Sequence, residues 1–319
     1  MSRQYPHRSA RISEDGFHVV MVAAIILVCA IIGFVGYKVT ASNHQQKTQQ
    51  NTATQTNDTS DNGKGQTVKW AFNEKELRWF TQGGTAPKCK EPFTFDQSPA
   101  ELSKMMVIGM PGAYRGFSYK PHGGMRLQDM NSGDIDIKMP IDATLTGITR
   151  YYEGNPAELQ YLLSFEADCG IAFRFDHIYT LAPAFQALAE KTPEPKVNDT
   201  RSDPNIQFPR TVFKSGDLVA TAVGFPRIKN FGFDFGVYDY RNRNEISKNA
   251  KWAGIHNMYQ ATEWYGACWL DMLPGADAAK AKQLAFVIIN PAKPNIISDY
   301  CSYAPHKTLD FNDGKPTDG

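Results

Sequence analysis

The sequence predicts a mainly β domain, an antiparallel β-sandwich or barrel with short helices, that follows one transmembrane helix and a flexible stalk. Three observations lead to this fold class. Val19 to Tyr37 are nineteen residues without a charge, and the segment "ASNHQQKTQQNTATQTNDTSDNGKGQ" after them has no aromatic and no large aliphatic side chain. From about Trp70 the chain consists of short segments that alternate apolar and polar residues between glycines. Alternation with a period of two is typical of strands.

The apolar run at 19–37 is long enough for a helix to cross a hydrocarbon layer of about 30 Å. Val39-Thr40-Ala41 would suit a signal peptidase, so a cleaved signal peptide is the alternative. The run exceeds the usual apolar region of about 7–15 residues in such peptides, and we therefore expect an uncleaved signal anchor. Three arginines precede it, which predicts a cytoplasmic tail at 1–18, a single-pass protein in the cell membrane and an extracytoplasmic main domain.

Residues 38–67 cannot bury enough surface to offset the entropy lost on ordering, and we expect a disordered stalk there. The globular domain is expected at 68–311, followed by a tail at 312–319. Ser98, with Pro99 and Glu101 after it, has the pattern of a helix start, and Gly109 would end that short helix.

Seven later segments are enriched in β-branched and aromatic residues and are predicted to be strands. They are "AYRGFSY", "DIDIKM", "TLTGITRYY", "LQYLLSFEA", "IAFRFDHI", "LVATAVGF" and "FGFDFGVYD". A helical period after Pro183, in "LAPAFQALAEK", predicts one helix among them. The segment "HNMYQATEWYGACWLDMLPG" fits either a helix or two strands.

Composition excludes some functions. The 319 residues include 34 basic and 33 acidic side chains, which gives a net charge of +1. The chain as a whole therefore lacks the strong positive charge that attracts nucleic acid, and we expect no nucleic-acid partner. The sequence has no phosphate loop, dinucleotide fingerprint or G-x-S-x-G motif.

The cysteines fit an extracytoplasmic domain. Cys29 lies inside the apolar run, and the other four, Cys89, Cys169, Cys268 and Cys301, allow three disulfide connectivities. We favour Cys268 with Cys301, because both lie in the C-terminal segment; four free buried thiols are the alternative. The spacing has no C-x-x-C, which argues against a zinc ribbon.

The stretch "KPHGGMRLQD" places His122 before two glycines. "IKMPIDATLTGI", "FRFDHIYTL", "FKSGDLVATAVG" and "FGFDFGVY" follow it in order. This succession resembles the lysostaphin-type (LytM-like) zinc endopeptidases of peptidoglycan over about 112–240, which leaves a C-terminal extension at 241–311. The resemblance implies a small antiparallel sandwich, similar in shape to the lipoyl domain, with a groove.

That family binds zinc through the His and Asp of H-x-x-x-D and the second His of a later H-x-H. The first His of H-x-H and a mid-chain His act as acid/base partners. By this resemblance His122 matches the first ligand and His177 the mid-chain catalytic histidine. Arg126 stands where the aspartate should be, and Gly232-Phe233-Asp234 stands in place of H-x-H, so Asp234 takes the last ligand position.

Two ligands are too few for catalytic zinc, which ordinarily takes three protein ligands and a water. Asp129, Asp134 or Asp136 could supply the missing carboxylate. We expect a degenerate, non-catalytic domain that needs no cofactor and whose groove, lined by Arg126, Asp176, Phe233 and Asp239 with the histidines, binds peptidoglycan or an envelope protein. The alternatives are an active zinc endopeptidase, with zinc as cofactor and His177 catalytic, and a purely structural envelope subunit.

Overall fold

The structure is a computed structural model, which describes residues 68–115, 118–193, 195, 210–289, 298–302, 307–310 and 316–318. The expected cytoplasmic tail (1–18), transmembrane helix (19–37) and stalk (38–67) lie outside these residues. Every described residue belongs to one compact unit, Gly65–Gly319. Within that described part, no helix is long and apolar enough to cross a membrane.

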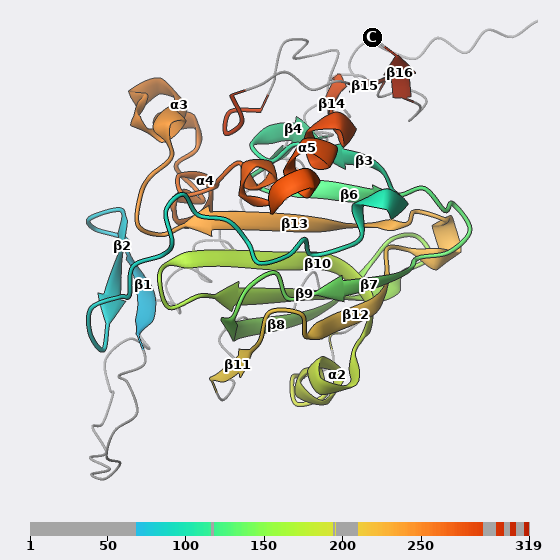
Figure 1. Ribbon diagram of the computed structural model, residues 1–319, viewed down its shortest axis with the longest axis horizontal. Coiled ribbons are helices and arrows are strands. Elements are labelled where there is room, and N and C mark those ends of the chain that lie inside the picture. Colours follow the sequence, from blue (N-terminus) through green and yellow to red (C-terminus); the bar gives the residue numbers. More distant parts are fainter. Residues whose placement is uncertain are drawn as a thin grey trace, which may run out of the picture. The chain divides into compact units, whose positions relative to one another are not determined.

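Twelve strands form one large mixed sheet, mostly antiparallel (Figure 1). Ten of them lie in the spatial order β11 (Thr211–Phe213), β8 (Ala143–Glu153), β9 (Glu158–Glu166), β10 (Ile171–Leu181), β13 (Gly232–Asp239), β6 (Gly123–Leu127), β3 (Met105–Gly109), β14 (Ala285–Ile289), β15 (Lys307–Asp310) and β16 (Pro316–Asp318). β12 (Leu218–Val223) branches from β10 and pairs with β7 (Asp134–Lys138). The path of described strands has two ends and does not close on itself. The prediction of a mainly β domain is confirmed.

Two small hairpins and several short helices complete the domain. The hairpins are β1 (Lys69–Asn73) with β2 (Arg78–Gln82), and β4 (Ala113–Arg115) with β5 (Ser118–Lys120). The helices are α2 (Pro183–Ala189), α3 (Ala250–Ile255), α4 (Gln260–Glu263), α5 (Gly275–Leu284) and the 3-10 turns η1 (Leu102–Lys104), η2 (Pro226–Ile228), η3 (Glu245–Lys248) and η4 (Trp269–Met272). Proline at the first position of α2 fits a helix start, and the helix predicted there is confirmed.

The helix predicted after Ser98 is wrong. The chain makes only the turn η1 and then enters β3, which pairs antiparallel with β6 and in parallel with β14. Ser98 does not cap a helix; its hydroxyl donates to Asp277 Oδ2 at 2.5 Å. The ladder with β6 and β14 outweighs the local capping pattern, because it buries Met105, Val107 and Ile108 completely.

The core lies against one face of the central strands and is rich in phenylalanine. Phe173 and Phe175 of β10 and Phe235 of β13 are fully buried, and the rings of Phe175 and Phe235 stack with centroids 5.2 Å apart. Trp269 of η4 packs edge-on against Phe235 at 5.2 Å. Aromatic pairs of this kind add about 0.5–1.5 kcal/mol to the hydrophobic contribution of their burial.

Two disulfides join distant parts of this unit. Cys89 pairs with Cys169 across 80 positions, and Cys268 pairs with Cys301, the pair expected from the sequence, across 33. Disulfides persist in oxidising compartments, so both bonds indicate an extracytoplasmic domain.

The sheet crosses two boundaries that the sequence suggested. β3 precedes the metallopeptidase-like segment (112–240), and β14 and β15 follow it in the expected C-terminal extension (241–311), yet all three belong to the same sheet. Pro316–Asp318, inside the expected tail (312–319), forms β16 on β15. Long-range pairing of this kind has no signal in local sequence.

Candidate functional site

Strand alternation gathers polar side chains on the face of the central strands that is turned away from the phenylalanine core. In β10, Arg174 and Asp176 alternate with buried phenylalanines, and in β13 Asp234 and Gly236 do the same. The register of the two strands pairs Arg174 with Gly236 and Asp176 with Asp234. Neighbours in a ladder lie within side-chain reach on one face, so these groups form one cluster.

His122 joins this cluster from the chain just before β6. Its Nε2 lies 2.8 Å from Oδ2 of Asp234, and both side chains are largely buried. Gly236 makes room for this contact, because a Cβ at that position would lie 2.8 Å from Cβ of His122 and 2.9 Å from the hydroxyl of Tyr238. The two residues matched to zinc ligands in the sequence are therefore in contact.

Arg174 stands against the same imidazole. Its NH2 nitrogen lies 2.8 Å from Nδ1 of His122 and 3.3 Å from Nε2. A guanidinium can only donate hydrogen bonds, so we assign Nδ1 as the acceptor and place the proton of a neutral His122 on Nε2, from which it is donated to Asp234. In this state both ring nitrogens of His122 are occupied.

Comparison with known proteins found no matching family, no matching curated protein and no matching solved structure.

The surroundings of Arg174 keep its guanidinium protonated. Burial acts to lower its pKa, but the nearby Tyr238, Asp176 and Asp234 more than offset this, and the pKa is raised above its ordinary value. The NH2 nitrogen lies 3.5 Å from Oδ2 of Asp176. A permanent cation therefore stands between the buried carboxylates.

His177 lies at an irregularity of β10. The register with β9 shifts between Phe175 and Ile178, and His177 has a φ of 61°. A left-handed backbone costs about 1–2 kcal/mol for a residue other than glycine, and strain of this kind gathers at functional sites. The bulge turns the imidazole toward the cluster, with Nε2 3.7 Å from Oδ2 of Asp234.

Two residues of β8 complete the cluster. The hydroxyl of Tyr151 donates to Oδ1 of Asp176 and lies 3.2 Å from Nδ1 of His177. Oδ1 of Asp176 also accepts the backbone N–H of His177 at 3.0 Å. Glu153 brings Oε2 to 3.5 Å from Nδ1 of His177. Glu153 is exposed and His177 half-buried, so these two form the open edge of the site.

The other residues expected in a groove lie elsewhere. Phe233 is buried in the core rather than on a groove wall. Asp239, at the opposite end of β13 from Asp234, receives two hydrogen bonds from Arg241, each 2.8 Å. Arg126 donates to Oδ1 of Asn230 at 2.5 Å, and burial lowers its pKa. Only Asp176 of the four proposed groove residues belongs to the cluster.

The donor set does not fit zinc. Among the described residues no group of three or more His, Cys, Asp and Glu side chains is arranged to hold a metal ion. Of the carboxylates suggested as a third ligand, Asp129 accepts the N–H of Asn131, and Asp136 lines a separate cavity. A zinc ligand needs an imidazole lone pair, and Arg174 takes the one on Nδ1 of His122.

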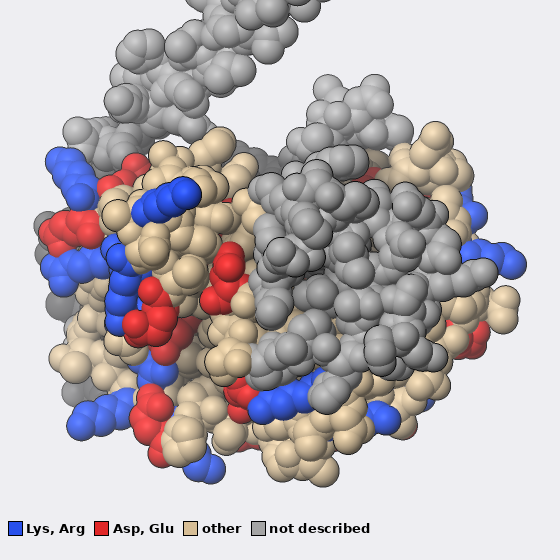
Figure 2. Space-filling model, turned by 90° about the horizontal axis from the view of Figure 1, so that it is seen from above, with Lys and Arg blue, Asp and Glu red and all other residues tan. Residues whose placement is uncertain are grey.

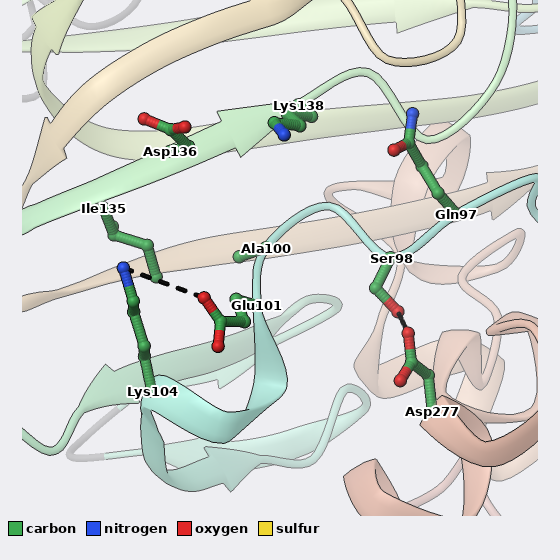
Figure 3. Close-up of a pocket in the computed structure, with 9 residues that line it drawn as sticks. All are labelled: Gln97, Ser98, Ala100, Glu101, Lys104, Ile135, Asp136, Lys138 and Asp277. Carbon is green, nitrogen blue, oxygen red and sulfur yellow. Dashed lines mark hydrogen bonds and ion pairs between the residues drawn. The ribbon is translucent and has the colours of Figure 1, made fainter.

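That separate cavity has a volume of about 350 Å³ and lies beside β7 and the start of α5 (Figure 3). Its wall carries charges of both signs: Lys104 lies 3.8 Å from Glu101, and Lys138 and Asp136 come from β7. Mixed signs recur on the face shown in Figure 2, where blue and red side chains are interspersed. Neither view shows a field of one sign.

The sequence favours an ion pair of Arg174 with a strand-end carboxylate, and Arg174 does lie 3.5 Å from Asp176, but sequence reasoning missed the contact of Arg174 with His122 and the roles of Tyr151 and Glu153. The pattern "FRFD" does place Arg174 and Asp176 on one strand face, which is a usable signal. Nothing in the local sequence brings Tyr151 and Glu153 to His177, because that contact depends on the order of β8, β9 and β10 in the sheet.

Proposed function

We propose that this chain is a membrane-anchored, extracytoplasmic protein that binds peptidoglycan, or an envelope protein, without catalysis. Its domain is similar to a degenerate lysostaphin-type metallopeptidase. The observation that carries the proposal is the 2.8 Å contact between the guanidinium of Arg174 and Nδ1 of His122, the residue matched to the family's first zinc ligand. A fixed cation at this place repels a second one and occupies the lone pair that a metal needs.

The positions of the other matched residues support the same reading. His122, His177 and Asp234 stand in the order of the family's motifs and meet in one cluster. Arg126, at the position of the missing aspartate, binds Asn230. We also propose the family's small sandwich for β7 to β13, which the departure of β10 toward β12 at His177 supports.

The open edge of the cluster is the part that a ligand can reach. Glu153 presents a carboxylate and His177 an imidazole side by side. Together they can accept from an ammonium or amide group and donate to a carbonyl, groups that cell-wall peptides carry. The disulfides agree with a place outside the cytoplasm.

The first experiment measures zinc in the full-length chain, purified without chelators, after exposure to zinc and dialysis. We expect far less than one zinc per chain, and no difference between the wild type and His122→Ala. Near-stoichiometric zinc that is lost in His122→Ala would overturn the proposal in favour of an active endopeptidase.

The second experiment measures co-sedimentation of the same protein with purified peptidoglycan. We expect the double variant His177→Ala with Glu153→Gln to lose binding, while Glu245→Gln, an exposed carboxyl on η3, keeps it. Equal binding by all three proteins would show that the cluster is not the binding site. Absence of binding by the wild type, together with capture of no envelope protein, would leave a structural spacer.

A further inference from the structure

Three large apolar side chains stand exposed at the end of α3 and in the loop before α4. Ile255 is 63%, Met258 78% and Tyr259 62% exposed, and we name these three residues the apolar tip. The five other exposed large hydrophobic residues of the described chain are at most 56% exposed and are scattered along it. Single exposed apolar residues are ordinary, but a group within five positions indicates an interaction surface.

Buried residues next to the apolar tip hold it in place. His256 and Glu263 are buried and bring Nδ1 and Oε2 to 2.7 Å, which closes the loop between them. Trp264 donates from its indole N–H to the carbonyl of His256 at 2.8 Å, and the ring of His256 stacks on Trp252 at 4.0 Å. The tip is therefore presented by an ordered loop, and Figure 1 shows α3 standing clear of the sheet.

The exposed charges next to the tip are net positive. Lys248 pairs with the exposed Glu245 at 2.5 Å, and Lys251, in the first turn of α3, is also exposed. These two lysines and one glutamate leave one positive charge, because the carboxylate of Glu263 is buried against His256. Apolar side chains beside exposed lysine are typical of segments that lie in the interface of an anionic bilayer, and tyrosine is enriched at that depth.

The place of the tip in the fold suits a bilayer as its partner. The indole N–H of Trp79 in β2 donates to the carbonyl of Ala261 at 3.0 Å, so α4 contacts the hairpin with which the described chain begins. Thirty residues, 38–67, separate that hairpin from the apolar run at 19–37. A polar linker of this length would span about 30 Å on average, so the proposed anchor at 19–37 would hold the domain near a bilayer.

We propose that Ile255, Met258 and Tyr259 insert into the interface of an anionic lipid bilayer and orient the domain on the membrane surface. The inference rests on the proposed membrane anchor. The peptidoglycan-binding edge at Glu153 and His177 is a separate part of the domain, which such contact would hold in one orientation.

The test places a tryptophan at the tip of the full-length chain, reconstituted in anionic vesicles whose acyl chains carry bromine. We expect the brominated vesicles to quench the added emission of Met258→Trp, relative to the wild type, more than unbrominated ones do. The matched control is Ile228→Trp, 45% exposed on η2 at the opposite end of β13, where we expect no added quenching. Neutral lipid or high salt should weaken the effect at 258.

Equal quenching at 258 and 228, or none at 258, would overturn the insertion of the tip. Failure of the anchor has a different signature, because the wild-type chain would then leave the vesicles in an alkaline wash. In that case the same full-length protein is sedimented with preformed anionic vesicles. The double variant Ile255→Ser with Met258→Ser is compared with the wild type. If it loses vesicle binding but keeps its circular dichroism spectrum, the proposal that the tip inserts still stands. If its binding is unchanged, the proposal is overturned.

Discussion

The substitution Arg174→Met tests directly the cation that faces the carboxylates of the cluster. Methionine keeps an apolar stem but removes the charge that faces Asp176 and Asp234, whose side chains are buried or nearly so. Removal of one partner from a buried ion pair costs about 3–5 kcal/mol, because the other charge is left uncompensated. We expect a loss of this size in the free energy of unfolding, a large part of the roughly 5–15 kcal/mol typical of a domain.

Urea unfolding at neutral pH, followed by tryptophan fluorescence, measures this loss, since all five tryptophans lie between Trp70 and Trp269. Lys282→Met is the control. Lys282 is 38% exposed and its partner Asp271 is 45% exposed, so water screens this pair. We expect the control to lose at most about 1 kcal/mol. Equal losses in the two variants would refute the reasoning that Arg174 compensates buried charge.

Three further predictions concern neighbouring features. Gly236→Ala should displace His122 and lower the free energy of unfolding in urea by about 1–3 kcal/mol, because the added methyl would lie 2.8 Å from Cβ of His122; unchanged stability would contradict that packing. Burial raises the pKa of Glu166 above its ordinary 4.5, so the folded state holds this proton more tightly and stability falls as pH rises above that value. Glu166→Gln should remove this fall, so that its advantage over the wild type grows from pH 4 to pH 8 in thermal unfolding; a constant difference would argue against it. The double variant Cys268→Ser with Cys301→Ser removes a disulfide that joins residues 33 positions apart. Its free energy of unfolding in urea should be about 4 kcal/mol lower than that of the wild type, with both proteins measured with and without reductant.

Much of the fold was predictable from local patterns. Alternation of apolar and polar residues marked β8, β9, β10, β12 and β13, and Pro183 marked the start of α2. These signals are local, since a strand that buries one face must alternate and a proline fits the first turn of a helix. The helix predicted after Ser98 failed because its segment pairs with strands that are remote in sequence.

The sequence by itself determined the mainly β class, the four cysteines available for pairing outside the apolar run, and the order of His122, His177 and Asp234 along the chain. Only the tertiary structure decided what those residues do. Arg174 reaches His122 because the strand between them, β13, carries glycine at position 236 and pairs in a register that sets Arg174 opposite that gap. Register is a property of the whole sheet, so no local pattern could show that Arg174 lies against His122.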